Sequence, residues 1–151
     1  MKKFQFSLDT VLSYKQQILD ALQGEYARIQ GEVRTQETRL ELLWEDYRRY
    51  AGEYRERCAQ GITAMDAMGY QSALRGREYE LQRETQVLEQ LKKKEEDKRA
   101  EVVAAKQDTS SIEKLREKKL DSYNAAIAKS EEQRIEEFVS SRRSAGMVQF
   151  G

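Results

Sequence analysis

A seven-residue repeat of apolar side chains runs through the first third of the chain and stops before Gly61. Its first row is Leu12, Leu19, Tyr26, Val33, Leu40, Tyr47 and Tyr54. A second row follows three residues later, at Leu22, Ile29, Leu43 and Tyr50, and includes the polar Gln36. This 3,4 spacing places both rows on one stripe of an α-helix, and a sustained stripe has to be covered by another helix. The repeat therefore predicts a long helix that packs lengthwise against a partner. That partner could be the rest of the same chain, a second copy or another protein.

The composition is typical of long helices with thin cores rather than of a compact domain. Of the 151 residues, 38% are hydrophobic, 36% are charged and none is proline. A disordered chain would have few aromatics and no sustained apolar period. The 27 basic and 27 acidic residues give zero net charge. This balance argues against nucleic-acid binding and against a polybasic membrane anchor, and no stretch approaches the ~20 apolar residues of a membrane span.

A helix stop and a helix start follow one another around Gly61. Glycine suits the left-handed position that ends a helix. Thr63 and Asp66 have the spacing of a capping box, with Asp in place of Glu, and Ile62 is placed to pack onto the next helix. The chain is therefore predicted to be all-α, a long two-stranded antiparallel coiled-coil hairpin with a C-terminal helical overhang. We expect one domain over residues 1–151, with helices at 8–59 and 63–140, a turn at 60–63, an irregularity near 69–76 and a frayed tail at 141–151.

The second half of the chain continues the pattern less regularly. Leu74, Leu81 and Leu88 are spaced by seven, and Leu91 follows three residues later. Residues 92–101 are almost wholly charged and are interpreted as a solvated helix segment. Val102, Ala105 and Ile112 restore the stripe weakly, and after them the phase slips. The later apolar residues that leave the strict heptad are Leu115, Leu120, Tyr123, Ile127, Ile135 and Phe138.

Folding back at Gly61 leaves the second helix longer than the first. Residue 8 then lies opposite about residue 114, so residues 115–140 have no facing segment within the hairpin. An unpaired apolar stripe of this kind is a candidate protein-binding surface. The alternatives are that the segment is partly disordered alone, or that residues 1–7, with Phe4 and Phe6, cover it.

The residue types needed for catalysis are largely missing. There is no histidine, and therefore neither the commonest general base nor the commonest metal ligand. Cys58 is the single cysteine, which fits a reducing cytosol and predicts a buried or loop thiol. The glycines form no phosphate-binding loop. We therefore expect no enzyme activity, cofactor or metal.

Several local motifs together resemble the FliJ family of flagellar type III export proteins. They are the opening FSLDTVL at residues 6–12, the tyrosine-rich end of the first helix, Gly-Ile-Thr at 61–63 with Tyr-Gln at 70–71, and IEKLREKK at 112–119. The resemblance covers nearly the whole chain, and the order and spacing of the motifs make it fairly specific.

The resemblance implies a monomeric, cytoplasmic, non-enzymatic coiled coil similar to the central stalk, or gamma, subunit of rotary ATPases. It implies that the end carrying both termini docks in the hexameric ring of the export ATPase FliI. It also implies binding to the export gate protein FlhA, escort of export chaperones, and coupling of the ATPase to export. The protein would associate peripherally, through its partners, with the inner face of the cell membrane at the flagellar base.

The resemblance also suggests two sets of binding residues. The gate-binding set is Leu43, Tyr47, Tyr50, Tyr54 and Ala73, although Arg77 and Glu84 depart from the family pattern. Burial inside the hairpin is the alternative for this set, and the neighbouring Trp44 is an alternative exposed anchor. The ATPase-binding set is Lys114, Leu115, Arg116, Lys118, Lys119, Leu120, Tyr123 and Ile127. Neutralisation of its charges by Glu113 and Glu117 is the alternative for this second set.

Two other functions fit the same stripe. A generic structural protein would use it to form a parallel homodimer, with Gly61 as a hinge. A chaperone would use the exposed overhang to hold export substrates.

Overall fold

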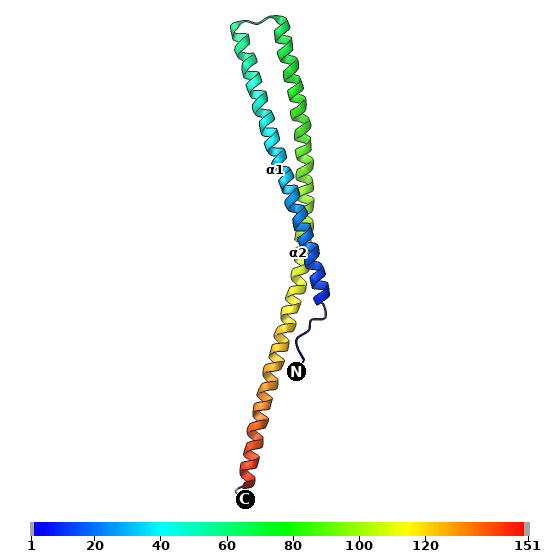
Figure 1. Cartoon of the computed structure of the whole chain (residues 1–151), viewed down its shortest axis with the longest axis vertical. Helices are drawn as coiled ribbons and strands as arrows, with labels where there is room; N and C mark the ends of the chain where they lie inside the picture. The colour runs from blue at the N-terminus through cyan, green and yellow to red at the C-terminus, as the bar shows by residue number, and fades with distance from the viewer. Residues whose placement is uncertain (1, 150–151) are drawn as a thin grey trace. The chain divides into compact units, whose positions relative to one another are not determined.

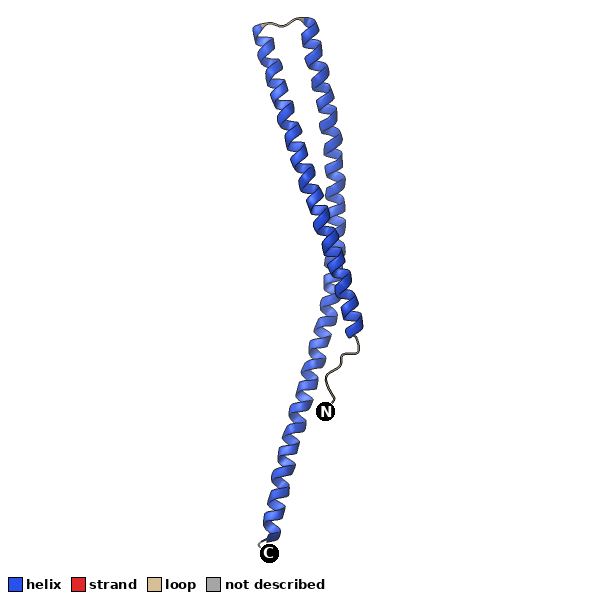
Figure 2. Cartoon of the chain, in the orientation of Figure 1, coloured by secondary structure: helices blue, strands red, loops and turns tan. Residues whose placement is uncertain are grey.

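The computed structural model describes residues 2–149, and within them the chain forms two α-helices. Helix α1 spans Asp9–Gln60 and helix α2 spans Ala64–Gln149 (Figure 1). Colouring by secondary structure shows only helix and loop in this part of the chain (Figure 2). The predicted all-α class, with two long helices packed against each other, is confirmed.

The short connection between the helices has the chemistry that its sequence indicates. Gly61 has a φ of 98°, in the left-handed region that only glycine enters at little cost. The hydroxyl of Thr63 accepts a hydrogen bond from the amide of Asp66 at 3.1 Å and so caps α2. Ile62 is half-buried. The chain therefore reverses direction over residues 61–63, and the Thr63 side chain pairs one amide in the first turn of α2.

Residues 19–104 form one compact unit, here called the loop unit. Residues of α1 that lie further from the loop contact residues that come later in α2. The hydrogen bonds that show this join Tyr54 with Gln71, Asp46 with Arg77, Gln36 with Glu84 and Glu25 with Lys98. The two helices of this unit are therefore antiparallel, as a hairpin requires.

The apolar stripe of α1 is the face that the loop unit buries. Ile29, Val33 and Leu40 are 6–8% exposed, and Leu81 of α2 is 4% exposed. The covered face of α2 recurs with strict 3,4 spacing at residues 70, 74, 77, 81, 84, 88, 91, 95, 98 and 102. A sustained seven-residue repeat of this kind favours left-handed supercoiling of the two helices.

The charged run 92–101 is a mostly solvated helix segment, as its composition predicts, with two exceptions. Glu95 and Lys98 are half-buried because they occupy two positions of the covered face. The Lys98 ammonium bridges Glu101, at 2.7 Å, and Glu25 of α1, at 2.9 Å. These two carboxylates raise the pKa of Lys98, with Glu101 the larger cause. Ion pairs therefore replace apolar contacts where the seam is polar.

Helix α2 is longer and more regular than its sequence suggests. It runs without a break through residues 69–76, where an irregularity was expected from two glycines. It also continues to Gln149, so the tail expected to fray from residue 141 is helical as far as the structure describes it. A glycine in a helix costs only about 1 kcal/mol, and the absence of proline leaves no strong helix breaker.

Residues 1–18 and 105–151 form the second compact unit, here called the terminal unit and described over residues 2–18 and 105–149. The start of α1 packs on α2 through an ion pair between Lys15 and Asp108 and another between Asp9 and Arg116, at 3.3 Å. Before α1 begins, residues 2–8 follow α2 without helical structure. Phe6 is buried there, at 7% exposed.

The expectation that residues 115–140 have no facing segment is wrong for the first part of that range. Phe4 lies against Tyr123, with ring centroids 5.5 Å apart. The segment before α1 can cover α2 because non-helical backbone is able to reach further per residue than the helical rise of about 1.5 Å. The covered face also changes spacing here, passing from Ile112 to Arg116 and then to Leu120. Every side chain from 131 to 145 is exposed, so the remainder of the stripe is uncovered.

Candidate partner-binding surfaces

The gate-binding set predicted from the sequence lies in the loop unit, on the covered side of the helices. Leu43, Tyr47, Tyr50, Tyr54 and Ala73 are all half-buried. The ring of Tyr70 packs on Tyr54 and Tyr50, with centroids 5.3 Å and 5.1 Å apart. Burial raises the pKa of Tyr70, as its largest cause. These tyrosines therefore hold the hairpin together, and each side chain is only partly available to a partner.

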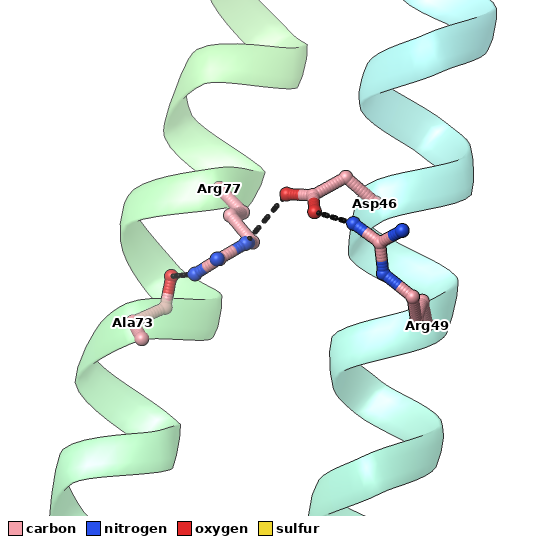
Figure 3. Close-up of polar contacts among 4 residues, drawn as sticks. All are labelled: Asp46, Arg49, Ala73 and Arg77. Atoms are coloured by element: carbon pink, nitrogen blue, oxygen red, sulfur yellow. Dashed lines mark hydrogen bonds and ion pairs between the residues drawn. The ribbon is translucent and has the colours of Figure 1, made fainter.

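Arg77 ties α2 to this aromatic cluster. Its guanidinium lies 4.1 Å from the centroid of the Tyr50 ring, a cation–π distance. Figure 3 shows Asp46 of α1 accepting hydrogen bonds from Arg77 at 2.9 Å and from Arg49 at 2.7 Å. Arg77, followed by Arg49, lowers the pKa of Asp46. Arg77 therefore occupies a seam position at which this sequence departs from the family pattern, and Asp46 neutralises its charge.

Glu84, the second residue that departs from the family pattern, also lies inside the seam. Its side chain is 9% exposed and its carboxylate accepts a hydrogen bond from the amide of Gln36 at 2.6 Å. The same amide donates to the Glu84 carbonyl at 3.1 Å, and Arg39 lies 3.3 Å from the carboxylate. Gln36, the single polar residue in its heptad row, is thus explained by its partner on α2.

Beside the seam lies a hollow of about 530 Å³ that Trp44 borders. Trp44 is 45% exposed and meets the Tyr47 ring edge-on, with centroids 5.8 Å apart. Leu81 also lines the hollow, together with Glu78. The phenol of Tyr47 donates to Glu78 at 2.8 Å, and this bond is the main cause of a raised Tyr47 pKa.

Further apolar residues of the loop unit are exposed outside the repeat, and Leu42 and Tyr79 are two of them. Leu42 is 61% exposed and Tyr79 is 69% exposed. Neither lies on the covered stripe, so periodicity did not single them out. The only sequence signal for them is an apolar residue at a position where the helix pattern expects a polar one.

The ATPase-binding set lies on α2 in the terminal unit and divides into two groups. Lys114, Leu115, Lys118 and Lys119 are exposed, and Leu115 is 38% so. Arg116, Leu120, Tyr123 and Ile127 are half-buried. The lysines are therefore available to a partner, whereas most of the apolar members are partly covered.

The N-terminal segment supplies the cover over two of these residues. The Tyr123 phenol donates a hydrogen bond to the carbonyl of Lys2. The Arg116 guanidinium lies 5.5 Å from the centroid of the Phe4 ring and donates to Asp9. From the sequence, Phe4 and Phe6 are predicted only as an alternative cover for α2, and Lys2 belongs to neither predicted set.

Comparison with known proteins identifies the family. The sequence pattern of the family described as flagellar FliJ protein matches residues 4–146 of the chain. The chain belongs to the FliJ family. No curated protein and no solved structure gives a significant match. FliJ-family membership makes this a flagellar protein related to type III protein export. The family is a non-catalytic part of the export apparatus.

Beyond the covered part of α2, the FliJ-family chain presents an apolar strip. Ile135 is 64% exposed, Phe138 is 62% exposed and Val139 is 44% exposed. Arg142 lies one turn further on, 5.4 Å from the centroid of the Phe138 ring. Helical spacing puts Ile135, Phe138 and Val139 on neighbouring positions of one face, where they form a continuous contact area.

The described residues of this FliJ-family chain hold no group of three or more potential acidic, histidine or cysteine metal ligands. Neither of the helices, over the part of the chain that the structure describes, is apolar enough along its length to cross a membrane. Cys58 is exposed near the loop rather than buried.

Proposed function

We propose that this FliJ-family chain is a non-enzymatic stalk of the flagellar type III export apparatus. In this proposal the terminal unit binds the hexameric ring of the export ATPase FliI, and the loop unit binds the export gate protein FlhA. By contacting both it helps to couple them, and it escorts export chaperones. The chain acts as a monomer and reaches the inner face of the membrane at the flagellar base through these partners.

The observation that carries the proposal is the uncovered face of α2 in the terminal unit. Ile135, Phe138 and Val139 are exposed on a helix that has no facing segment from residue 131 to 145. Contiguous exposed apolar residues on a helix are typical of a surface that a partner protein covers. The exposed Lys114 and Lys118, earlier on the same helix, add a cationic contact for an acidic partner.

For the gate, the half-buried tyrosines support a contact centred on the exposed side chains next to them. Trp44 offers a large, accessible indole, and the apolar Leu81 is among the residues that line the hollow beside it. Tryptophan and tyrosine are enriched among residues that dominate binding energy. The gate contact is therefore expected to use Trp44 together with the exposed part of Tyr47.

The ATPase part of the proposal is tested with purified FliI and a charge-reversal variant. Lys114→Glu with Lys118→Glu is expected to abolish most of the stimulation of hexamer assembly and ATP hydrolysis by the chain, because both exposed cations become anions. Lys93→Glu with Lys94→Glu makes the same charge change on exposed residues of the loop unit and serves as the control. Equal stimulation by the two variants would contradict the assignment.

The gate part is tested with the cytoplasmic region of FlhA in a direct binding assay. Trp44→Ala is expected to weaken binding by at least about tenfold, the size of effect common for a buried interface tryptophan. Tyr14→Ala removes an aromatic residue that is 62% exposed in the terminal unit and provides the matched control. An unchanged affinity for Trp44→Ala, with the fold intact by circular dichroism, would exclude this surface.

The same exposed strip supports a chaperone that holds export substrates as the second candidate. A variant carrying Ile135→Ser, Phe138→Ser and Val139→Ser separates the two functions. Loss of client binding with retained FliI stimulation would favour the chaperone. Loss of FliI stimulation alone would favour the stalk.

A further inference from the structure

The N-terminal segment and α2 enclose an open hollow of about 870 Å³ within the terminal unit. One wall is the extended segment before α1, and the other is a single turn of α2. The lining residues are Lys2, Lys3, Phe4, Gln5, Phe6, Ser7, Lys119, Ser122 and Tyr123. The hollow therefore exists only because the extended segment follows the helix, and α2 alone does not make it.

The hollow is cationic, although the chain as a whole is neutral. Lys2, Lys3 and Lys119 line it, and no carboxylate does. None of these three lysines forms an ion pair with another described residue. Elsewhere lysines on the covered faces are neutralised, as Lys15 is by Asp108 and Lys98 by Glu25. Three cations around one concavity without an internal counter-charge are complementary to an acidic ligand.

The hollow is also partly apolar, and aromatic contacts fix its walls. Phe4 is held between the ring of Tyr123 and the guanidinium of Arg116. Phe6 is buried, and the Tyr123 phenol anchors the Lys2 carbonyl. Walls that are already ordered before binding lower the entropic cost of receiving a ligand.

We propose that this hollow binds an acidic peptide segment of a protein partner, with an aliphatic or aromatic side chain inserted against Phe4 and Tyr123. The lysines supply contacts to the partner's carboxylates, and the aromatic wall supplies an apolar anchor. A concave site between two chain segments suits a protruding peptide better than it suits a flat lipid surface. One source of that peptide is the export ATPase, and for this assignment alone the inference rests on the proposed function.

The test uses the full chain and a fluorescent probe peptide in which glutamate and leucine alternate. The chain is expected to bind this peptide, to bind it more weakly as salt is raised, and not to bind a twin with lysine in place of glutamate. A variant with Lys2→Gln, Lys3→Gln and Lys119→Gln is expected to lose affinity by about tenfold, since each solvent-exposed ion pair contributes modestly. A variant with Lys93→Gln, Lys94→Gln and Lys106→Gln removes the same charge outside the hollow and is expected to bind like the original chain.

A second variant tests the apolar wall, because charge alone could attract an acidic peptide to any basic surface. Phe4→Ala leaves all three lysines in place and is expected to weaken binding by several-fold. Equal loss in both lysine variants, or no loss in Phe4→Ala, would overturn the inference. So would binding to phosphatidylserine vesicles that is stronger than binding to the peptide.

Failure of the hollow proposal can be distinguished from failure of the stalk proposal, because Lys114 and Lys118 do not line the hollow. Lysine-dependent peptide binding without FliI stimulation would support the hollow and reject the proposed ATPase contact. FliI stimulation that depends on Lys114 and Lys118 but not on Lys2, Lys3 and Lys119, with no peptide binding, would reject the hollow.

Discussion

The loop unit and the terminal unit use the same helices but cover them in different ways. In the loop unit a helix faces a helix, and residues of both alternate at 3,4 spacing along the seam. In the terminal unit α2 is faced first by the start of α1, then by an extended segment, and over residues 131–145 by no part of the described chain. The loop unit covers its apolar stripe within the chain, whereas the terminal unit leaves part of its apolar stripe exposed for a partner.

Polar residues in the seam sharpen the contrast. Within the loop unit Gln36, Glu84, Arg77 and Lys98 occupy covered positions, and each has a partner on the other helix. Polar groups at such positions specify register because a shifted pairing would leave them unsatisfied. The polar seam residues therefore favour one alignment of the two helices, at positions where apolar residues would bury more apolar surface.

The largest difference between the units is expected from truncating one apolar side chain in each. Leu81→Ala, at a residue that is 4% exposed, should lower the free energy of unfolding by about 3 kcal/mol. Ile135→Ala, at a residue that is 64% exposed, should change it by less than about 0.5 kcal/mol. Chemical denaturation followed by circular dichroism measures both. Similar losses would mean that the strip at residue 135 is covered, for example by a second copy.

The next effect comes from the buried amide in the loop unit. Gln36→Ala removes a donor from the nearly buried Glu84 carboxylate and is expected to cost about 2 kcal/mol. Gln16→Ala in the terminal unit breaks an exposed contact to Glu113 and should cost less than about 0.5 kcal/mol.

Replacing both members of the buried pair tests whether it sets the register. Gln36→Leu with Glu84→Leu should recover most of the lost stability, because no buried polar group is left unpaired. Spin labels at residues 19 and 103, with the mass from light scattering, report whether the intrachain antiparallel pairing survives. A parallel homodimer in the original chain would instead give a doubled mass and a long distance between the labels.

A smaller global effect is expected when the N-terminal segment is released. Phe6→Ala removes the buried anchor of residues 2–7. Because a terminal segment can detach without unfolding the helices, we expect the global stability to fall by about 1 kcal/mol or less. Hydrogen exchange should show faster exchange at the amide of Asp9, which donates to the carbonyl of Phe6, and unchanged rates around Leu81. A large global loss would show that the segment supports the whole terminal unit.

The smallest expected effect is the response of the loop unit to acid. Arg77 and Arg49 lower the pKa of Asp46 below its usual 3.8, and Lys98 lowers that of Glu25 below 4.5. A carboxylate with a lowered folded pKa contributes stability above its unfolded pKa and loses it as the pH falls through the folded value. Thermal stability should therefore decline below about pH 4.5.

Asp46→Asn tests this origin of the acid response. The variant should be slightly less stable at neutral pH and lose less stability on acidification. Glu56→Gln, an exposed change without an ion-pair partner among the described residues, should leave the pH profile unaltered. An unchanged profile in Asp46→Asn would place the acid response elsewhere.

Periodicity was sufficient to predict two long helices and the covered face of the first, while glycine and capping chemistry indicated the turn. Leu12, Val33 and Leu40 are buried because residues spaced by seven stay on one side of a supercoiled helix. Gly61 takes the left-handed conformation because it has no Cβ, and Thr63 caps because its hydroxyl reaches the amide of Asp66. The candidate sites were less predictable: the tyrosines at 47, 50 and 54 share the buried stripe, so their rank as binding residues could not be read from spacing alone.

The sequence by itself determined that this chain forms two long helices joined at Gly61, and its motifs pointed to the FliJ family. Local repeats carry that information because a helix face is fixed by neighbours three and four residues apart. Only the tertiary structure decided that Glu84 is paired with Gln36, and that Lys2, Phe4 and Tyr123 share one hollow. Such contacts join residues far apart in the chain, and an extended segment without a repeat carries no pattern that says where it lies.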